Sequence, residues 1–207
     1  IKSIEYLNFL PFGYIKDGCF ARALYMSMEL AAEGIPSSSY YVYGDLRPAD
    51  ATAWGYHVAP MLKVGNEEPW ILDPAFDVKP LRGSAWIEKT KPYHGEFKTE
   101  VKAASDYSRP SAFNEKHLLS KFDELPAFQT EDIGDACGYM YDYILEEART
   151  DKKFHNLDEM NTAVQQKRSR LFERTTELIK NLRARSKIEH HQWDERLFRR
   201  QCVEAIQ

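Results

Sequence analysis

The chain has 207 residues, of which 43% are hydrophobic and 13% are aromatic. This composition excludes a disordered chain, because it supplies enough apolar surface for a folded core. No apolar run approaches the roughly 18 residues that a membrane span requires. The net charge of −4 is unevenly spread, since residues 151–207 carry 13 Lys and Arg against 9 Asp and Glu, whereas the rest carries 15 against 23. We therefore expect an acidic front part and a mildly basic tail with different roles.

The first expected element is a helix that begins near Cys19, after a turn. Asp17 is a good N-cap residue and Gly18 permits a tight entry, so Cys19 should lie in the first turn of the helix. A buried stripe behind the cysteine is supplied by Phe20, Leu24 and Ala31.

Three β-strands and two short helices are expected next. Runs rich in aromatic and β-branched residues predict strands over residues 39–44, 53–64 and 69–73. Short helices are predicted over residues 84–90 and 115–124 from the spacing of their apolar residues. This half of the chain therefore mixes helix and sheet.

Long helices are predicted from about residue 132 onward. Proline is absent from this part, and charged residues surround apolar positions that recur at helical spacing, namely Tyr139, Tyr143, Leu145, Leu171, Leu178 and Leu182. The pattern indicates two or three helices, with breaks near residues 150–157 and 186–189.

The chain has three cysteines, Cys19, Cys137 and Cys202. Their odd number and wide spacing predict neither a disulfide framework nor a structural zinc site, and we expect a reducing compartment at the place of action. Cys137 and Cys202 fall on predicted helices without nearby bases, so we interpret them as structural. Because the chain begins with Ile1 rather than Met, we expect an excised or processed piece, in which localisation signals upstream would not be visible.

Cys19 is the first candidate for chemistry. The partial positive charge at a helix N-terminus, about half an elementary charge, favours a thiolate over a thiol. The alternative interpretation is a small core residue on an amphipathic helix. The choice depends on whether the rest of the sequence supplies partners for a nucleophile.

His57 is a candidate partner. Alternation over residues 53–64 places it on one face of a strand between Gly55 and Ala59, with bulky residues on the opposite face. Small flanking residues leave space for another element against the imidazole. A core histidine that forms internal hydrogen bonds is the alternative interpretation.

Asp73 is the third candidate. The Gly65–Asn66 turn signal predicts a hairpin between the second and third strands. A two-residue loop would place Pro74 opposite His57, and a bulge or a three-residue loop would place Asp73 there. Both registers stay open, and both bring a carboxylate near the imidazole. A turn-forming Asp before Pro74 is the alternative interpretation.

These three residue types together can perform nucleophilic catalysis. A thiolate attacks, a histidine pairs with it and later protonates the leaving group, and a carboxylate fixes the tautomer of the imidazole. The backbone N–H of Cys19 can donate a hydrogen bond to an oxyanion.

Five short stretches resemble the motifs of bacterial protein-glutaminases, in the same order and at similar spacing. They are DGCFARA (17–23), YVYGDL (41–46), WGYHVAP (54–60), ILDPAF (71–76) and AW (85–86). Enzymes of that family deamidate glutamine side chains in proteins and have a Cys-His-Asp core like that of papain and transglutaminase. The resemblance covers roughly residues 11–90.

The resemblance implies an α+β fold with a papain- or transglutaminase-like core, in which an N-terminal helix bearing the cysteine packs on a small antiparallel sheet. We expect a catalytic domain over residues 1–128 and a helical C-terminal region over residues 129–207. By resemblance, Cys19, His57 and Asp73 are the nucleophile, the general acid/base and the orienting carboxylate. No metal or nucleotide cofactor is implied.

The resemblance also marks residues that we assign to substrate binding, namely Gly44, Asp45, Trp54, Tyr56 and Trp86. Trp54 and Tyr56 either wall a substrate cleft or belong to the core behind the sheet. Secreted members of the family favour folds supported by cystines. The cysteine-poor composition therefore suggests a secreted or translocated bacterial effector or toxin domain that acts in a reducing host or target-cell cytosol.

Two C-terminal stretches are further candidates. His190, His191 and Asp194 offer too few ligands for a metal site, so a solvated helix face is favoured. The basic stretch 167–187 is interrupted by acidic residues and poor in aromatic residues. It therefore predicts an exposed helix, with a protein partner ranking above nucleic acid.

The function predicted from the sequence is a cysteine-dependent deamidase that converts protein-bound glutamine to glutamate through a thioester. A transglutaminase or a cysteine protease could use the same three residues. A non-catalytic module that binds a partner is the alternative from another class.

Overall fold

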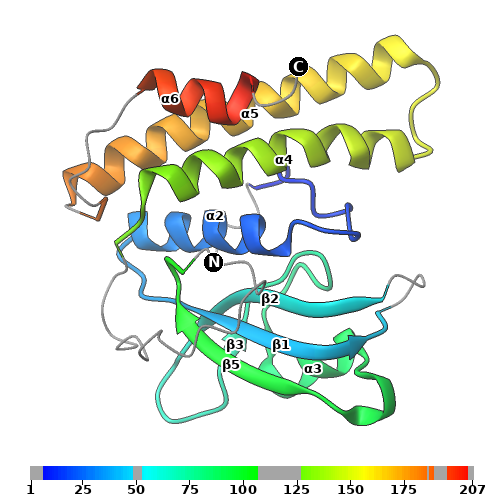
Figure 1. Ribbon diagram of the computed structural model, residues 1–207, viewed down its shortest axis with the longest axis vertical. Coiled ribbons are helices and arrows are strands. Elements are labelled where there is room, and N and C mark those ends of the chain that lie inside the picture. Colours follow the sequence, from blue (N-terminus) through cyan, green and yellow to red (C-terminus); the bar gives the residue numbers. More distant parts are fainter. Residues whose placement is uncertain (1–6, 49–52, 107–126, 186, 189–194, 205–207) are drawn as a thin grey trace.

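In the computed structural model, the described residues are 7–48, 53–106, 127–185, 187–188 and 195–204. They form a mixed structure in which helices lie over both faces of an antiparallel sheet (Figure 1). The expected α+β class, with a helix that bears the cysteine packed on a small sheet and a helical C-terminal part, is confirmed.

The sheet has five strands in the order β4-β3-β2-β1-β5, and every neighbouring pair is antiparallel. The strands are β1 (Ser38–Leu46), β2 (Trp54–Leu62), β3 (Trp70–Ile71), β4 (Leu81–Arg82) and β5 (Lys98–Ala103). The three predicted strands are confirmed, although the third is shorter than expected. The sequence did not indicate β4 or β5.

The helix α2 (Cys19–Ala32) and the helix α3 (Gly83–Thr90) cover opposite faces of the sheet. Tyr41 and Val58 share a hydrophobic cluster with α2, whereas their neighbours Val42 and Ala59 share another with Trp86 of α3. Successive side chains of a strand point to opposite faces, so β1 and β2 are buried on both sides. This arrangement brings the N-terminus of α2 and the face of α3 to the same strand, β2.

The hairpin between β2 and β3 has a register that the sequence did not predict. Met61 pairs with Ile71 and Leu62 with Trp70, so neither expected register occurs. The reason is that the Gly65–Asn66 turn lies inside a longer connection over residues 63–69, so that the strands pair only from Leu62 and Trp70. The strand pairing then ends, and Asp73 reaches His57 from a turn rather than from a facing strand position.

Three more helices follow in the C-terminal part, α4 (Thr130–Thr150), α5 (Leu157–Ala184) and α6 (Glu195–Arg199). A short 3₁₀-helix, η1 (Tyr93–Gly95), precedes β5, and a π-helical turn, η2 (Arg200–Glu204), ends the described chain. The predicted break near residues 150–157 is confirmed. The helix predicted over residues 115–124 lies outside the described residues.

The C-terminal helices and α2 share one core. A single hydrophobic cluster includes Leu24 of α2, Met140 of α4 and Leu178 of α5. Figure 1 shows α4 and α5 stacked over α2, on the side away from the sheet, and α2 is therefore buried from Phe20 to Ala31. The boundary between a catalytic domain over residues 1–128 and a helical region over residues 129–207 stays a prediction.

A disulfide joins Cys137 of α4 to Cys202 of η2, so the two cysteines are structural as expected, but the expectation that the cysteines form no disulfide framework was wrong for this pair. The pairing requires the C-terminal segment to fold back on α4. Gly138 permits that close approach, because a Cβ at this position would lie 2.6 Å from the carbonyl oxygen of Gln201. The two cysteines are 65 residues apart in the sequence, so no local sequence pattern indicated this contact.

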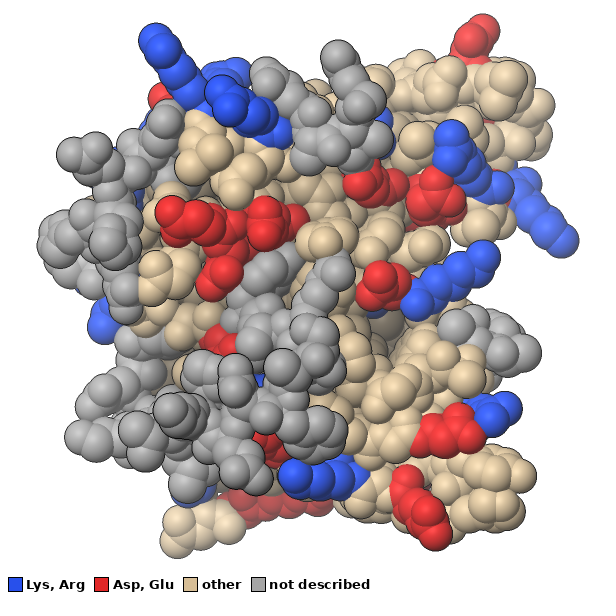
Figure 2. Space-filling model, viewed as in Figure 1, with Lys and Arg blue, Asp and Glu red and all other residues tan. Residues whose placement is uncertain are grey.

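Charged residues of both signs are interleaved over the face shown in Figure 2. Acidic side chains gather over the start of α4, where Glu131, Asp132 and Asp135 lie. Partial burial, and then the repulsion of Asp135 and Glu131, raise the pKa of Asp132 to about 6. No helix in the described part of the chain is long and apolar enough to cross a membrane.

Candidate active site

Cys19 is the first residue of α2 and is a free, half-buried cysteine. The helix is capped by Gly18 in a left-handed conformation (φ 86°), not by Asp17 as expected. Asp17 instead accepts a hydrogen bond from the backbone N–H of Gly18 through Oδ1, at 2.6 Å. A Cβ at position 18 would lie 2.6 Å from the ring of Tyr143, so both conformation and space require glycine here.

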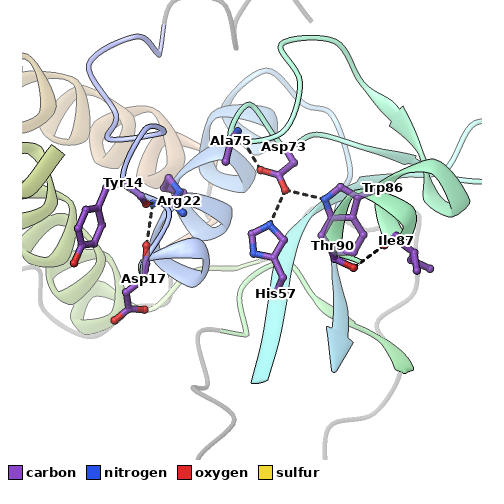
Figure 3. A network of polar contacts seen from close by, with 9 residues as sticks. All are labelled: Tyr14, Asp17, Arg22, His57, Asp73, Ala75, Trp86, Ile87 and Thr90. Atoms are coloured by element: carbon purple, nitrogen blue, oxygen red, sulfur yellow. Dashed lines mark hydrogen bonds and ion pairs between the residues drawn. The ribbon is translucent and has the colours of Figure 1, made fainter. Parts of the chain in front are cut away.

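His57 and Asp73 form a buried pair. The distance from Nε2 of His57 to Oδ2 of Asp73 is 2.7 Å, and the two residues are 2% and 5% exposed. The same carboxylate oxygen accepts a hydrogen bond from the indole N–H of Trp86 at 2.8 Å, as Figure 3 shows. Its other oxygen accepts from the backbone N–H of Ala75, so Asp73 is fixed by three donors.

Aromatic rings surround the imidazole of His57. The ring centroids of Trp54, Phe76 and Trp86 lie 4.7, 5.1 and 5.4 Å from it, and Trp86 is stacked on it. These rings exclude water from the pair. Helix α3, which carries Trp86, thus packs against His57 beside the small residue Ala59, whereas the space at Gly55 is open.

The charges of this pair support each other. Burial by itself would lower the pKa of His57, but the attraction of Asp73, its hydrogen bond and the hydrogen bond with Cys19 together raise the pKa to about 9. Burial opposes ionisation of Asp73 too, yet His57 and the hydrogen bond from Trp86 hold its pKa below the usual value. At neutral pH the pair is therefore an imidazolium and a carboxylate.

Cys19 and His57 line the same cleft, and a hydrogen bond with Cys19 is among the influences that raise the pKa of His57. Because Asp73 occupies Nε2, the nitrogen left for the thiol is Nδ1. The structure thus brings the three sequence-predicted residues together from the start of α2, from β2 and from the turn after β3.

A cleft of about 180 Å³ opens beside Cys19. His57, Trp54 and Tyr56 line it, so the two aromatic residues wall the cleft while they also pack partly into the core. A second cleft of about 530 Å³ shares Ile15 and Trp54 with the first. Its other lining residues are Pro48, Ala75, Phe76, Ala85, Glu88, Lys89 and Lys91.

Three residues assigned to substrate binding lie elsewhere. Trp86 is completely buried and cannot contact a substrate, so that assignment was wrong; it positions Asp73 instead. Gly44 and Asp45 do not line either cleft. Asp45 is exposed and pairs with Arg47, and Gly44 is needed because a Cβ there would lie 2.8 Å from the carbonyl oxygen of Glu96.

Arg22 is a site residue that the sequence analysis missed. It is buried, lines the cleft, and donates through Nη1 to the carbonyl oxygens of Pro11, Tyr14 and Asp17. An arginine among the apolar residues of α2, three positions after Cys19, was the available signal.

The residues of the suggested metal site, His190, His191 and Asp194, lie outside the described residues. Within the described ranges, no group of three or more His, Cys, Asp or Glu side chains is arranged to hold a metal ion.

A cysteine at a helix N-terminus, beside a buried His-Asp pair on an antiparallel sheet, is the arrangement of a mixed helix-and-sheet fold that the sequence predicted. Residues 1–90 match the family model described as glutaminase. The resemblance seen in the sequence is therefore confirmed over that range.

Solved structures of protein-glutaminases are also similar to the chain. A crystal structure of pro-protein-glutaminase is 31% identical, with a TM-score of 0.42 over 48% of this chain and 40% of that one. The NMR structure of protein-glutaminase from Chryseobacterium proteolyticum is 24% identical, with a TM-score of 0.46 over 62% and 71% of the two chains. A crystal structure of protein-glutaminase is 26% identical, with a TM-score of 0.46 over 62% and 72%. No curated protein matches the chain.

Proposed function

We propose that the protein is a cysteine-dependent deamidase that converts glutamine side chains of proteins to glutamate through a thioester. The observation that carries this proposal is the buried His57–Asp73 pair, with a free Cys19 in reach of the imidazole, within the segment that matches the glutaminase family. We propose that Cys19 is the nucleophile, His57 the general acid/base and Asp73 the carboxylate that orients the imidazole.

The reaction has two halves. The thiolate of Cys19 attacks the amide carbon, and the backbone N–H at the start of α2 donates to the oxyanion that forms. His57 gives its proton to the amide nitrogen, ammonia leaves, and a thioester remains. Neutral His57 then takes a proton from water, which attacks the thioester and releases glutamate and the thiolate. Asp73 keeps the ring oriented and stabilises the imidazolium.

The two clefts favour a polypeptide substrate. The cleft of about 180 Å³ beside Cys19 is narrow and suits a single side chain. Trp54 separates it from the larger cleft, which offers space for the chain that flanks the glutamine. The rim of the larger cleft carries Lys89 and Lys91 against Glu88. This excess of positive charge favours an acidic residue near the target glutamine.

Mass spectrometry of an unfolded protein substrate such as casein tests the proposal. We expect the mass increase of deamidation at glutamines, with release of ammonia in equal amount, and loss of both with Cys19→Ala. Cleaved peptide bonds would assign the site to a protease. Cross-linked product in the presence of an added amine would assign it to a transglutaminase, which forms the same thioester.

The place of action is also part of the proposal. The disulfide between Cys137 and Cys202 removes the compositional reason for a reducing cytosol, because disulfides persist mainly in oxidising compartments. We therefore favour an exported enzyme that folds under oxidising conditions. An effector or toxin role, and a protein partner at the C-terminal helices, stay predictions.

A further inference from the structure

We propose that two side chains of helix α4, Tyr143 and Glu147, position the proposed nucleophile, because they hold the loop that leads into Cys19. The inference rests on the proposed role of Cys19 as the nucleophile. Residues 11–18, here called the approach loop, connect directly to Cys19, and α4 lies outside the segment that matches the glutaminase family.

The approach loop is held from inside by Arg22. Its guanidinium donates to the carbonyl oxygen of Pro11 at 3.2 Å. It also donates to the carbonyl oxygens of Tyr14 at 3.0 Å and Asp17 at 3.1 Å, two residues that Figure 3 shows beside it. These bonds curl the loop around the start of α2. They do not fix it relative to the rest of the molecule, because Arg22 belongs to α2 itself.

Tyr143 fixes the end of the loop next to the cysteine. Its hydroxyl donates to Oδ2 of Asp17 at 2.8 Å, while Oδ1 of the same carboxylate accepts the backbone N–H of Gly18 at 2.6 Å. Its ring stacks on Tyr14, with centroids 4.6 Å apart, and packs against Gly18. One side chain of α4 therefore sets the position of the residue that immediately precedes Cys19.

Glu147, one helical turn further along α4, fixes the other end of the loop. Its Oε1 accepts the backbone N–H of Gly13 at 2.7 Å, and its Oε2 accepts from the ammonium of Lys167 on α5 at 2.6 Å. Its side chain is only 16% exposed, so solvent competes weakly for these bonds. The loop is thus anchored directly to α4, and to α5 through the ion pair of Glu147 with Lys167.

The consequence is that the C-terminal helices determine where the sulfur of Cys19 lies relative to the imidazole of His57. Nucleophilic catalysis is sensitive to displacements of about 1 Å, which is less than an unanchored loop permits. Loss of an anchor should therefore reduce the chemical step more than substrate binding.

The test uses Tyr143→Phe and Glu147→Gln in the full chain, which remove one hydrogen bond or one charge and keep the shape of the side chain. Tyr141→Phe and Glu131→Gln are the matched controls on the same helix, since Tyr141 contacts Arg168 and Glu131 is exposed in the first turn of α4, at the end away from Tyr143 and Glu147. For each anchor variant we expect kcat to fall roughly three- to tenfold with KM unchanged. The controls should behave as the wild type.

Alkylation of Cys19 by iodoacetamide is a second measurement that does not require deamidase activity. In the anchor variants, the rate at pH 7 should fall at least about twofold, because the sulfur is displaced from the imidazolium of His57 that favours its reaction. Unchanged kcat and unchanged alkylation would overturn the inference, as would a lower Tm without either effect. If the wild-type protein deamidates nothing but the anchor variants are still alkylated more slowly than the wild type, the positioning role is supported and the proposed function is refuted.

Discussion

His57 combines two features that give it an unusual charge. Gly55 and Ala59 are its small neighbours on one face of β2, and the rings of Trp54 and Trp86 pack against the imidazole and exclude water. Asp73 is the partner that compensates for this burial, at 2.7 Å. An enclosed imidazolium is retained at neutral pH only because this carboxylate is equally enclosed.

Activity should be lost on the alkaline side as the pH rises through about 9, the pKa to which His57 is raised. Above that pH the imidazole is neutral and can neither pair with the thiolate nor protonate the leaving amide. The raised pKa also stabilises the folded protein. That contribution is complete below 6.5, the ordinary pKa of histidine, and is lost between 6.5 and about 9. Profiles of kcat/KM and of urea unfolding against pH measure the two effects.

Asp73→Asn is the matched variant for this prediction. It removes the attraction that raises the pKa of His57 and leaves burial as the main influence, so the alkaline limb should move to lower pH. An alkaline limb near pH 9 in both proteins would contradict the assignment to His57.

The three candidate residues could be identified from the sequence because their signals are local. A cysteine after Asp17-Gly18, a histidine between small residues and an aspartate after a short strand each lie within one element. The role of Trp86 could not be predicted in the same way. Its hydrogen bond to Asp73 exists only because α3 packs on the face of the sheet that carries His57.

Helix α2 is buried on both sides, because it lies between the sheet and the C-terminal helices. Its Glu29 is 1% exposed, and both its carboxylate oxygens accept hydrogen bonds from Arg174 of α5, at 2.9 and 2.7 Å. A carboxylate inside an apolar layer requires such a bidentate partner. This pair fixes the register between α2 and α5.

Arg174→Met should lower the free energy of unfolding by about 3 kcal/mol, because Glu29 would remain buried without its partner. The value is at the low end for a buried pair, since the side chain of Arg174 is 32% exposed. Urea denaturation measures the change. Arg170→Met, at an exposed position of the same helix, should change it by less than about 0.5 kcal/mol. Adding Glu29→Gln to Arg174→Met should restore part of the loss, and equal stability of the two single variants would contradict the prediction.

The helices were predicted more accurately than the sheet. The helical spacing of apolar residues locates α4 and α5 because it repeats over many turns within one segment. The register of β2 and β3 depends instead on the length of a loop, and a Gly-Asn pair inside a longer connection gives a misleading signal. The pairing of β5 with β1 joins segments more than fifty residues apart, which no local pattern records.

At the scale of the whole molecule, α4 connects two separate constraints. Its first half is joined through Cys137 to the C-terminal segment, and its second half contacts the approach loop through Tyr143 and Glu147. The end of the chain therefore stabilises the helix on which the proposed position of the nucleophile depends. The disulfide nevertheless lies away from both clefts, since neither cysteine lines them.

Removal of the disulfide should therefore reduce stability much more than activity. Closing a loop of 65 residues corresponds to about 4 kcal/mol of unfolding free energy in the chain-entropy account. We expect Cys137→Ala with Cys202→Ala to lose roughly that amount in urea denaturation, and to keep kcat/KM within about twofold at 25 °C because α4 remains packed in the core. Reduction of the wild-type protein by dithiothreitol should reproduce the loss of stability, whereas Cys19→Ala, which retains the disulfide, should not show it.

Unchanged stability on reduction would contradict the prediction, because it would show that the disulfide contributes nothing beyond the packing of the core. A large loss of activity in the folded double variant would also contradict it, because the position of Cys19 would then depend on the C-terminal segment.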